Sequence, residues 1–347
     1  MESDMMTETI QSEHPQFLFT VGLMMTYRCT VACSHCIVKA GPHRTEEMDT
    51  EDACRWLQQL SEYGSREVEA VALTGGEPFY NTTQLQAISE YAGKLGLVVT
   101  AVTNAYWADS KEKAVETLAS MRYIDAIAVS ADVPHQQFIP LQHVKNAIWA
   151  ARVLSREYNV SFSTHDLQDP DYLAMKNELL EEVTEEKMKT TIILEVGRAA
   201  KAGKNKQLPY PAQGACNMAS YPVFFPNGDV IACIGPLITL PRRHPLYLGN
   251  AKKESVADIF DKAKKNTLLH AIRAFGPQEL VTLLRENGYE KLTPDEFAED
   301  SICDVCYRLF KDSYICRALY DLSENDKNFT DKVNAGRYHY FGENPYE

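Results

Sequence analysis

Long apolar runs are missing from this 347-residue chain. No stretch approaches the ~18 consecutive apolar residues that a membrane span requires. The first residues, Met-Glu-Ser-Asp-Met-Met-Thr-Glu, lack the basic region and the apolar core of a secretory signal peptide. We therefore expect a cytoplasmic protein that does not use a membrane as its partner.

An excess of positive charge is also missing. The chain has 48 acidic residues against 35 lysines and arginines, which gives a formal net charge of −13. A nucleic-acid partner would require a basic face, so the composition argues against one. The hydrophobic fraction of 45% is ordinary for a globular protein, and the length suggests about two domains.

Cysteine is absent between Cys54 and Cys216, although the whole chain has nine. In a reducing compartment, closely spaced cysteines hold metal more often than they form disulfides. The nine fall into short groups on either side of the gap, which suggests two metal centres in two domains. The groups are Cys29, Cys33 and Cys36; Cys54; Cys216 and Cys233; Cys303 and Cys306; and Cys316.

The first group forms a C-x3-C-x2-C motif directly after the apolar run 17–25, which has the composition of a strand. A 4Fe–4S cluster normally takes four thiolates, so three leave one iron open, as a catalytic metal keeps one position free. Two alternatives remain on these residues alone. Cys29, Cys33, Cys36 and His43 would suit a zinc knuckle, or the three thiols would simply be buried.

Short strand-like runs alternate with amphipathic helices through the first 200 residues. The predicted strands are 17–25, 68–73, 97–103, 124–130, 160–164 and 190–196, and the predicted helices are 50–63, 82–95, 110–121, 141–158 and 172–183. Such alternation predicts βα units on a parallel sheet, whose sites form at the carboxyl ends of the strands. Periodicity alone does not separate a barrel from a flat sheet.

The C-x3-C-x2-C motif after a first strand resembles the signature of the radical SAM superfamily. The resemblance implies an α/β fold, namely a partial (β/α)6 TIM-like barrel. It also implies that Cys29, Cys33 and Cys36 hold a 4Fe–4S cluster whose open iron binds S-adenosylmethionine (SAM). In that family an electron from the cluster cleaves SAM, and the resulting 5′-deoxyadenosyl radical takes a hydrogen atom from the substrate. The family usually has an aromatic residue where this chain has His35, whose ring also stacks but titrates.

Several loops after the predicted strands resemble further SAM-binding motifs of the family. Thr74 to Pro78 resembles the GGEP motif, in which glycines permit a close approach and a carboxylate pairs with the SAM ammonium. Segments resembling the family's TNG, SxD and GRA stretches follow later strands. The resemblance therefore implies a set of cofactor-binding residues: His35, Thr74, Gly75, Gly76, Glu77, Asn104, Ser130, Asp132 and Arg198. For His135 and His165, also near strand ends, substrate contact and surface turn remain open.

The second half begins after a Lys-, Gly- and Pro-rich linker at 201–213. Asn227-Gly228 predicts a hairpin that returns Cys233 toward Cys216. This opening resembles a SPASM or twitch domain, the auxiliary cluster-binding extension of many radical SAM enzymes. With the C-x2-C pair, the resemblance implies at least one auxiliary 4Fe–4S cluster, most simply on Cys216, Cys233, Cys303 and Cys306. We expect a mobile tail at 1–15, the barrel at 16–205, and a small hairpin-plus-helix auxiliary domain with a C-terminal extension at 206–347.

Two cysteines are left over. Cys316 has three readings: a metal ligand that replaces one of the four, with Asp312 serving a degenerate second site; a thiol that donates a hydrogen atom to a substrate radical, as in radical SAM epimerases; or an inert buried group. Cys54 is expected to be a small buried hydrophobe.

The resemblance implies an enzyme that crosslinks, oxidises or epimerises a ribosomally made peptide. The alternative is a dehydrogenase or epimerase of a sugar, aminocyclitol or other small molecule, and a more remote one is a non-catalytic metal-binding scaffold. The implied partners are a peptide precursor or small-molecule substrate and a reductant of the flavodoxin or ferredoxin type.

Overall fold

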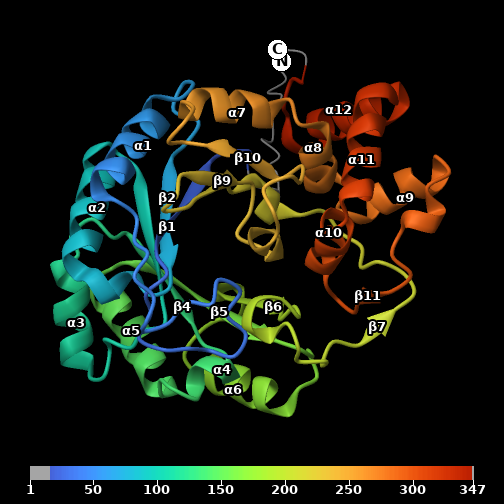
Figure 1. Ribbon diagram of the computed structural model, residues 1–347. Helices are drawn as coiled ribbons and strands as arrows, with labels where there is room; N and C mark the ends of the chain where they lie inside the picture. Colours follow the sequence, from blue (N-terminus) through green and yellow to red (C-terminus); the bar gives the residue numbers. More distant parts are fainter. Residues whose placement is uncertain (1–15, 346–347) are drawn as a thin grey trace, which may run out of the picture.

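The computed structural model describes residues 16–345, so the tail predicted at 1–15 lies outside the described residues. Six parallel strands form the centre of one curved sheet (Figure 1). They are β1 (Thr20–Thr26), β2 (Ala70–Gly75), β3 (Val98–Thr103), β4 (Ala126–Ser130), β5 (Glu157–Thr164) and β6 (Met188–Ile192). Each pairs with the next in sequence order, which confirms the predicted partial (β/α)6 TIM-like barrel.

Helices connect these strands, and most lie outside the curved sheet (Figure 1). They are α1 (Thr50–Glu62), α2 (Thr82–Lys94), α3 (Lys111–Ser120), α4 (Val133–Gln136), α5 (Leu141–Val153) and α6 (Pro170–Leu180). Side chains that accept hydrogen bonds from first-turn amides start them, including Asp49 at α1, Asn81 at α2 and Ser110 at α3. These caps are local, which is why the sequence predicts the helix starts well.

Two boundaries differ from the prediction by four residues or more. The helix predicted to reach residue 158 ends at Val153, because Ser155 turns the backbone with φ 54° and the amide of Arg156 bonds back to Ala151 O at 2.8 Å. The chain is therefore already extended at Glu157, where β5 begins. The last predicted strand, 190–196, is shifted toward the N-terminus, since β6 ends at Ile192.

The hairpin after the linker continues the same sheet. It consists of β8 (Val223–Phe224) and β9 (Asp229–Ile231), followed by β10 (Tyr247–Asn250), and Gly228 turns it with φ 89°. Strand β8 pairs in parallel with β1, where Gly22 lies opposite Val223. The sheet order is β10-β9-β8-β1-β2-β3-β4-β5-β6, so no break in the sheet marks the boundary expected near residue 205.

Helix α7 (Val256–Lys264) packs against α1 and β10. The remaining helices lie beside the open side of the barrel (Figure 1). They are α8 (Thr267–Ala274), α9 (Gln278–Glu286), α10 (Ile302–Phe310), α11 (Ser313–Asn325) and α12 (Lys327–Phe341). A short strand within the linker, β7 (Gln207–Leu208), pairs antiparallel with β11 (Phe297–Ala298). Within residues 16–345, no helix combines the length and apolar character needed to cross a bilayer.

Candidate functional site

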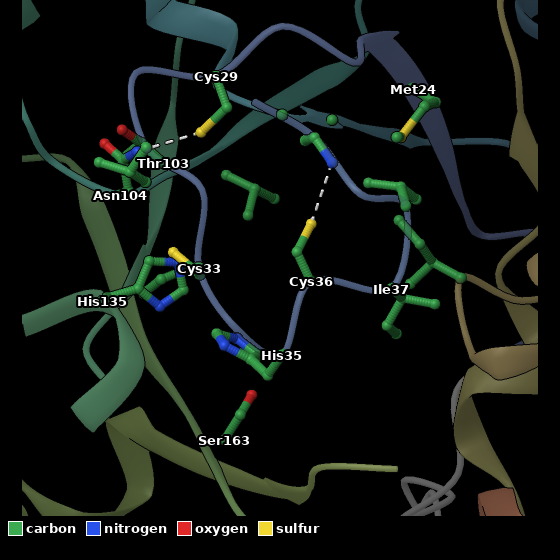
Figure 2. Close-up of a pocket in the computed structure, with 18 of the residues that line it drawn as sticks. Met24, Cys29, Cys33, His35, Cys36, Ile37, Thr103, Asn104, His135 and Ser163 are labelled. Carbon is green, nitrogen blue, oxygen red and sulfur yellow. Dashed lines mark hydrogen bonds between the residues drawn. The ribbon is translucent and has the colours of Figure 1, made fainter. Parts of the chain in front are cut away.

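A cavity of ≈ 230 Å³ lies at the carboxyl ends of the parallel strands, where such sheets form their sites (Figure 2). The loop after β1 brings the thiols of Cys29, Cys33 and Cys36 into its lining. The opposite wall comes from the ends of β2 to β5. Its residues include Gly75, Gly76, Asn104, Ser130, His135 and Ser163.

Arg198, which follows β6, binds the backbone of the cysteine loop. Its guanidinium donates hydrogen bonds to the carbonyls of Cys33 and Ala40, and its backbone amide donates to Cys36 O at 3.1 Å. The preceding residue, Gly197, lies so close that an added Cβ would stand 2.5 Å from Ile37 O. Arg198 therefore shapes the loop, and the guanidinium itself is absent from the cavity lining.

Each thiol of the loop has an N–H group beside it. The side-chain amide of Asn104 lies 3.6 Å from Cys29 Sγ, and the backbone amide of Ala40 lies 3.4 Å from Cys36 Sγ (Figure 2). His135 hydrogen-bonds the side chain of Cys33. Burial, the largest cause, raises the pKa of Cys29 to about 12. A bound metal ion favours the thiolate of a cysteine that coordinates it.

The two glycines after β2 serve close packing of the chain itself. A Cβ on Gly75 would stand 2.5 Å from Thr26 O, and one on Gly76 would overlap the carbonyl of Arg28. Their backbone also lines the cavity, so the loop offers main-chain groups there without side chains in the way. Thr74, one residue earlier, is buried and does not line the cavity.

Glu77 turns away from the cavity into the protein. It is fully buried and accepts hydrogen bonds from the amides of Phe79 at 3.1 Å and Asn104 at 2.7 Å, and from the Thr103 hydroxyl at 2.9 Å. Burial raises the pKa of its carboxyl to about 7 against these bonds. The structure thus uses this residue, implied to pair with the SAM ammonium, to fix the turn after β3.

Asp132 follows β4 and binds two histidines. Its buried carboxylate lies 2.7 Å from His135 Nδ1 and 3.5 Å from His35 Nε2, and the two rings meet edge to face at 5.1 Å. Burial lowers the pKa of His35. For His135, burial also favours the neutral form, yet the hydrogen bonds to Asp132 and Cys33 raise its pKa to about 10. The sequence does carry a signal for the contact between Asp132 and His135, namely the Asp-x-x-His spacing at the start of a helix, although this contact was not predicted from it.

Residues 23–158 match the model of the radical SAM superfamily. This match covers the cysteine motif and runs from within β1 to the start of β5. It is 24% identical over 327 residues to YydG of Bacillus subtilis (strain 168), a protein named for peptide biosynthesis, and the match covers 90% of this chain and 99% of that protein. The solved structure of native anSMEcpe with bound AdoMet superimposes on this chain with a TM-score of 0.51 at 12% identity. The match covers 91% of this chain and 99% of that chain, and it shows the shared fold. These comparisons support a radical SAM domain in the first half of the chain.

Radical SAM proteins bind SAM and a 4Fe–4S cluster, and the residues present fit both groups. Three thiols from one short loop meet in one cavity, each with an N–H neighbour that would stabilise a thiolate. Beside them the lining holds glycine backbone, the Ser130 hydroxyl and the His35 ring, which are polar and flat groups suited to a nucleoside.

A second cavity of ≈ 270 Å³ adjoins the first and holds four further thiols. They belong to Cys216, Cys233, Cys303 and Cys306, of which the last two lie on α10. The two cavities share the lining residues His35, Ile37, Ser163 and Ile234. Burial raises the pKa of all four thiols, that of Cys303 to about 12.

The leftover cysteines line neither cavity. Cys316 is buried on α11, where its thiol donates to Phe310 O at 3.4 Å. Asp312 caps the same helix by accepting from the amide of Tyr314 at 2.8 Å. This placement fits the reading of Cys316 as an inert buried group, while hydrogen donation and ligation beside Asp312 stay predictions. Cys54 is half-buried on α1, and His165 also lies outside both linings.

Proposed function

We propose that the enzyme cleaves SAM reductively and abstracts a hydrogen atom from a ribosomally made peptide, which it crosslinks, oxidises or epimerises. The convergence of Cys29, Cys33 and Cys36 on one cavity carries the proposal. A SAM-bound cluster supplies a 5′-deoxyadenosyl radical as the hydrogen-abstracting species. The peptide substrate is proposed because YydG, which matches over nearly its whole length, is named for peptide biosynthesis.

In this proposal the three loop cysteines hold the cluster, while Gly75, Gly76, Ser130 and His35 contact SAM. Asp132 orients the His35 ring through its carboxylate. Thr74, Glu77 and Arg198 act from outside the lining, where they position the loops that carry the contacting groups. The apolar residues around the cavity, such as Val31 and Ile37, exclude water and stray hydrogen donors from the reaction space.

We place one auxiliary 4Fe–4S cluster on Cys216, Cys233, Cys303 and Cys306. The shared lining of the two cavities would set it beside the substrate, where it binds the substrate or accepts an electron from it. All nine cysteines are free thiols, which fits the reducing cytoplasm and an external one-electron reductant of the flavodoxin or ferredoxin type.

The test uses the anaerobically reconstituted full chain with SAM and a chemical reductant. Formation of 5′-deoxyadenosine should be stimulated by members of a peptide library and accompanied by a mass change or a deuterium-detectable inversion in the peptide. Stimulation by sugars or aminocyclitols and by no peptide would replace the peptide substrate with a small molecule. No 5′-deoxyadenosine from a protein that holds iron would contradict the whole proposal.

A further inference from the structure

Asn104 lies on the turn after β3 with its side chain against the cysteine loop (Figure 2). It is 5% exposed, and its Nδ2 lies 3.6 Å from Cys29 Sγ and 3.3 Å from Thr30 Oγ1. The family resemblance implies a SAM contact for this residue. In the structure its hydrogen-bond donor is instead directed at a thiol.

The orientation of this amide follows from its other partner. Asn104 Oδ1 accepts a hydrogen bond from the backbone amide of Tyr106 at 3.0 Å. The two ends of an asparagine amide differ only in whether they donate or accept, and a flipped side chain would face the Tyr106 N–H with its own NH2 group. The donor end must therefore be the one that faces Cys29.

The turn beneath Asn104 is fixed as well. The buried carboxylate of Glu77 accepts from the Asn104 amide at 2.7 Å and from the Thr103 hydroxyl at 2.9 Å. Thr103 Oγ1 in turn accepts from the amide of Ala105 at 3.0 Å and from Trp107 Nε1 at 3.0 Å. Asn104 is thus a donor held in place before any ligand arrives.

A donor so placed has a predictable electronic effect. Reducing an iron–sulfur cluster adds negative charge, part of which resides on its cysteine sulfurs, and hydrogen bonds to those sulfurs raise the reduction potential. Of the three N–H neighbours of the loop thiols, that of Cys36 is a backbone group and that of Cys33 belongs to a titratable ring. Asn104 is the neutral side chain among them, so it can be removed without changing the charge.

We propose that Asn104 is a positioning residue which donates a hydrogen bond to the Cys29 thiolate and thereby raises the reduction potential of the cluster held by the loop cysteines. The inference rests on the proposed function, because it requires a cluster at that loop. It goes beyond it in assigning control of the cluster's electron affinity to a residue outside the ligand set.

Two substitutions separate this role from a structural one. Asn104→Leu removes the donor and keeps the size, whereas Asn104→Asp keeps the acceptor for Tyr106 and puts a carboxylate oxygen beside the sulfur. We expect both to make the potential more negative, with the larger shift for Asp. A tenfold change in the oxidised-to-reduced ratio at fixed applied potential corresponds to ~59 mV for one electron, and we expect about this shift for Leu.

The measurement is an EPR-monitored redox titration of the reconstituted full chain without SAM, together with iron and sulfide content. The auxiliary cluster is an internal control, since its potential should not move. Asn205→Leu is the matched variant, because that asparagine bonds Ile193 O and lines neither cavity.

Full iron content with an unmoved potential in both Asn104 variants would overturn the inference and leave the proposed function intact. Loss of the loop cluster from both variants would also overturn it, because Asn104 would then be needed for assembly. An unsubstituted chain that binds no iron would instead overturn the proposed function.

Discussion

The close approach of Gly197 to the cysteine loop makes a quantitative prediction with a matched control. Gly197 has φ +59°, and a Cβ there would stand 2.5 Å from Ile37 O and 2.6 Å from Cys36 O. Gly203 has nearly the same φ, +61°, and nothing within 4 Å of its Cβ position. Gly→Ala at either site carries the same backbone strain of about 1–2 kcal/mol.

Only Gly197→Ala adds steric overlap. Ordinary contact begins at 3.4 Å, so the Ile37 carbonyl would have to move by 3.4 − 2.5 = 0.9 Å. Overpacking of this kind costs a further ~1–3 kcal/mol, which gives a total of roughly 2–5 kcal/mol for Gly197→Ala against about 1–2 for Gly203→Ala. The displaced carbonyl follows Cys36, so the variant should also lose iron from the loop.

The assay is urea unfolding of the two metal-free variants, followed by iron content after reconstitution. We expect Gly203→Ala to keep the full iron content and Gly197→Ala to lose about half of it. Equal stability and equal iron content in the two variants would refute the argument that Gly197 is required by the approach to the loop.

Three further predictions concern other parts of the molecule. The pKa of Glu77 is raised from 4.5 to about 7, so the stability that its neutral form contributes is present below pH 4.5 and is lost as the pH rises through 7. The loss is about 3 kcal/mol at most. Urea unfolding at a series of pH values should show this fall in the free energy of unfolding, and Glu77→Gln should remove it. Cys216→Ala should lose about four iron atoms per chain while Cys316→Ala loses none, and the opposite pattern would exchange their roles. Trp56 is fully buried, and its indole N–H donates a hydrogen bond to Ala251 O at 3.1 Å. Trp56→Phe should therefore lower the free energy of unfolding by roughly 2–3 kcal/mol. A change of less than about 1 kcal/mol would show that this contact between α1 and the segment after β10 is not needed for stability.

Local chemistry made much of the barrel predictable. The caps at Asp49, Asn81 and Ser110 act within one helical turn, and Asn227-Gly228 forms its hairpin turn between neighbouring residues. The end of α5 was predicted less well, because no glycine or proline marks the turn at Ser155, and the predicted helix extended to residue 158 instead of ending at Val153.

The placement of the site residues depends on contacts that the sequence does not show. A carboxylate after two glycines suggests a ligand contact, but the inward turn of Glu77 depends on three donors that meet it only in the folded chain. The pairing of β8 with β1 joins segments about 200 residues apart. Cys316 lies on α11, after the turn that ends α10, and lines neither cavity, although its spacing from Cys306 suggested a ligand.

Iron and sulfide per chain after anaerobic reconstitution, measured with and without Cys29, Cys33 and Cys36 changed to Ala, show whether these three residues hold an iron–sulfur cluster. We expect about eight iron atoms per chain, falling to about four in the triple variant, with SAM cleavage only in the unsubstituted chain. An unchanged iron content in the triple variant, or zinc in place of iron, would contradict this expectation.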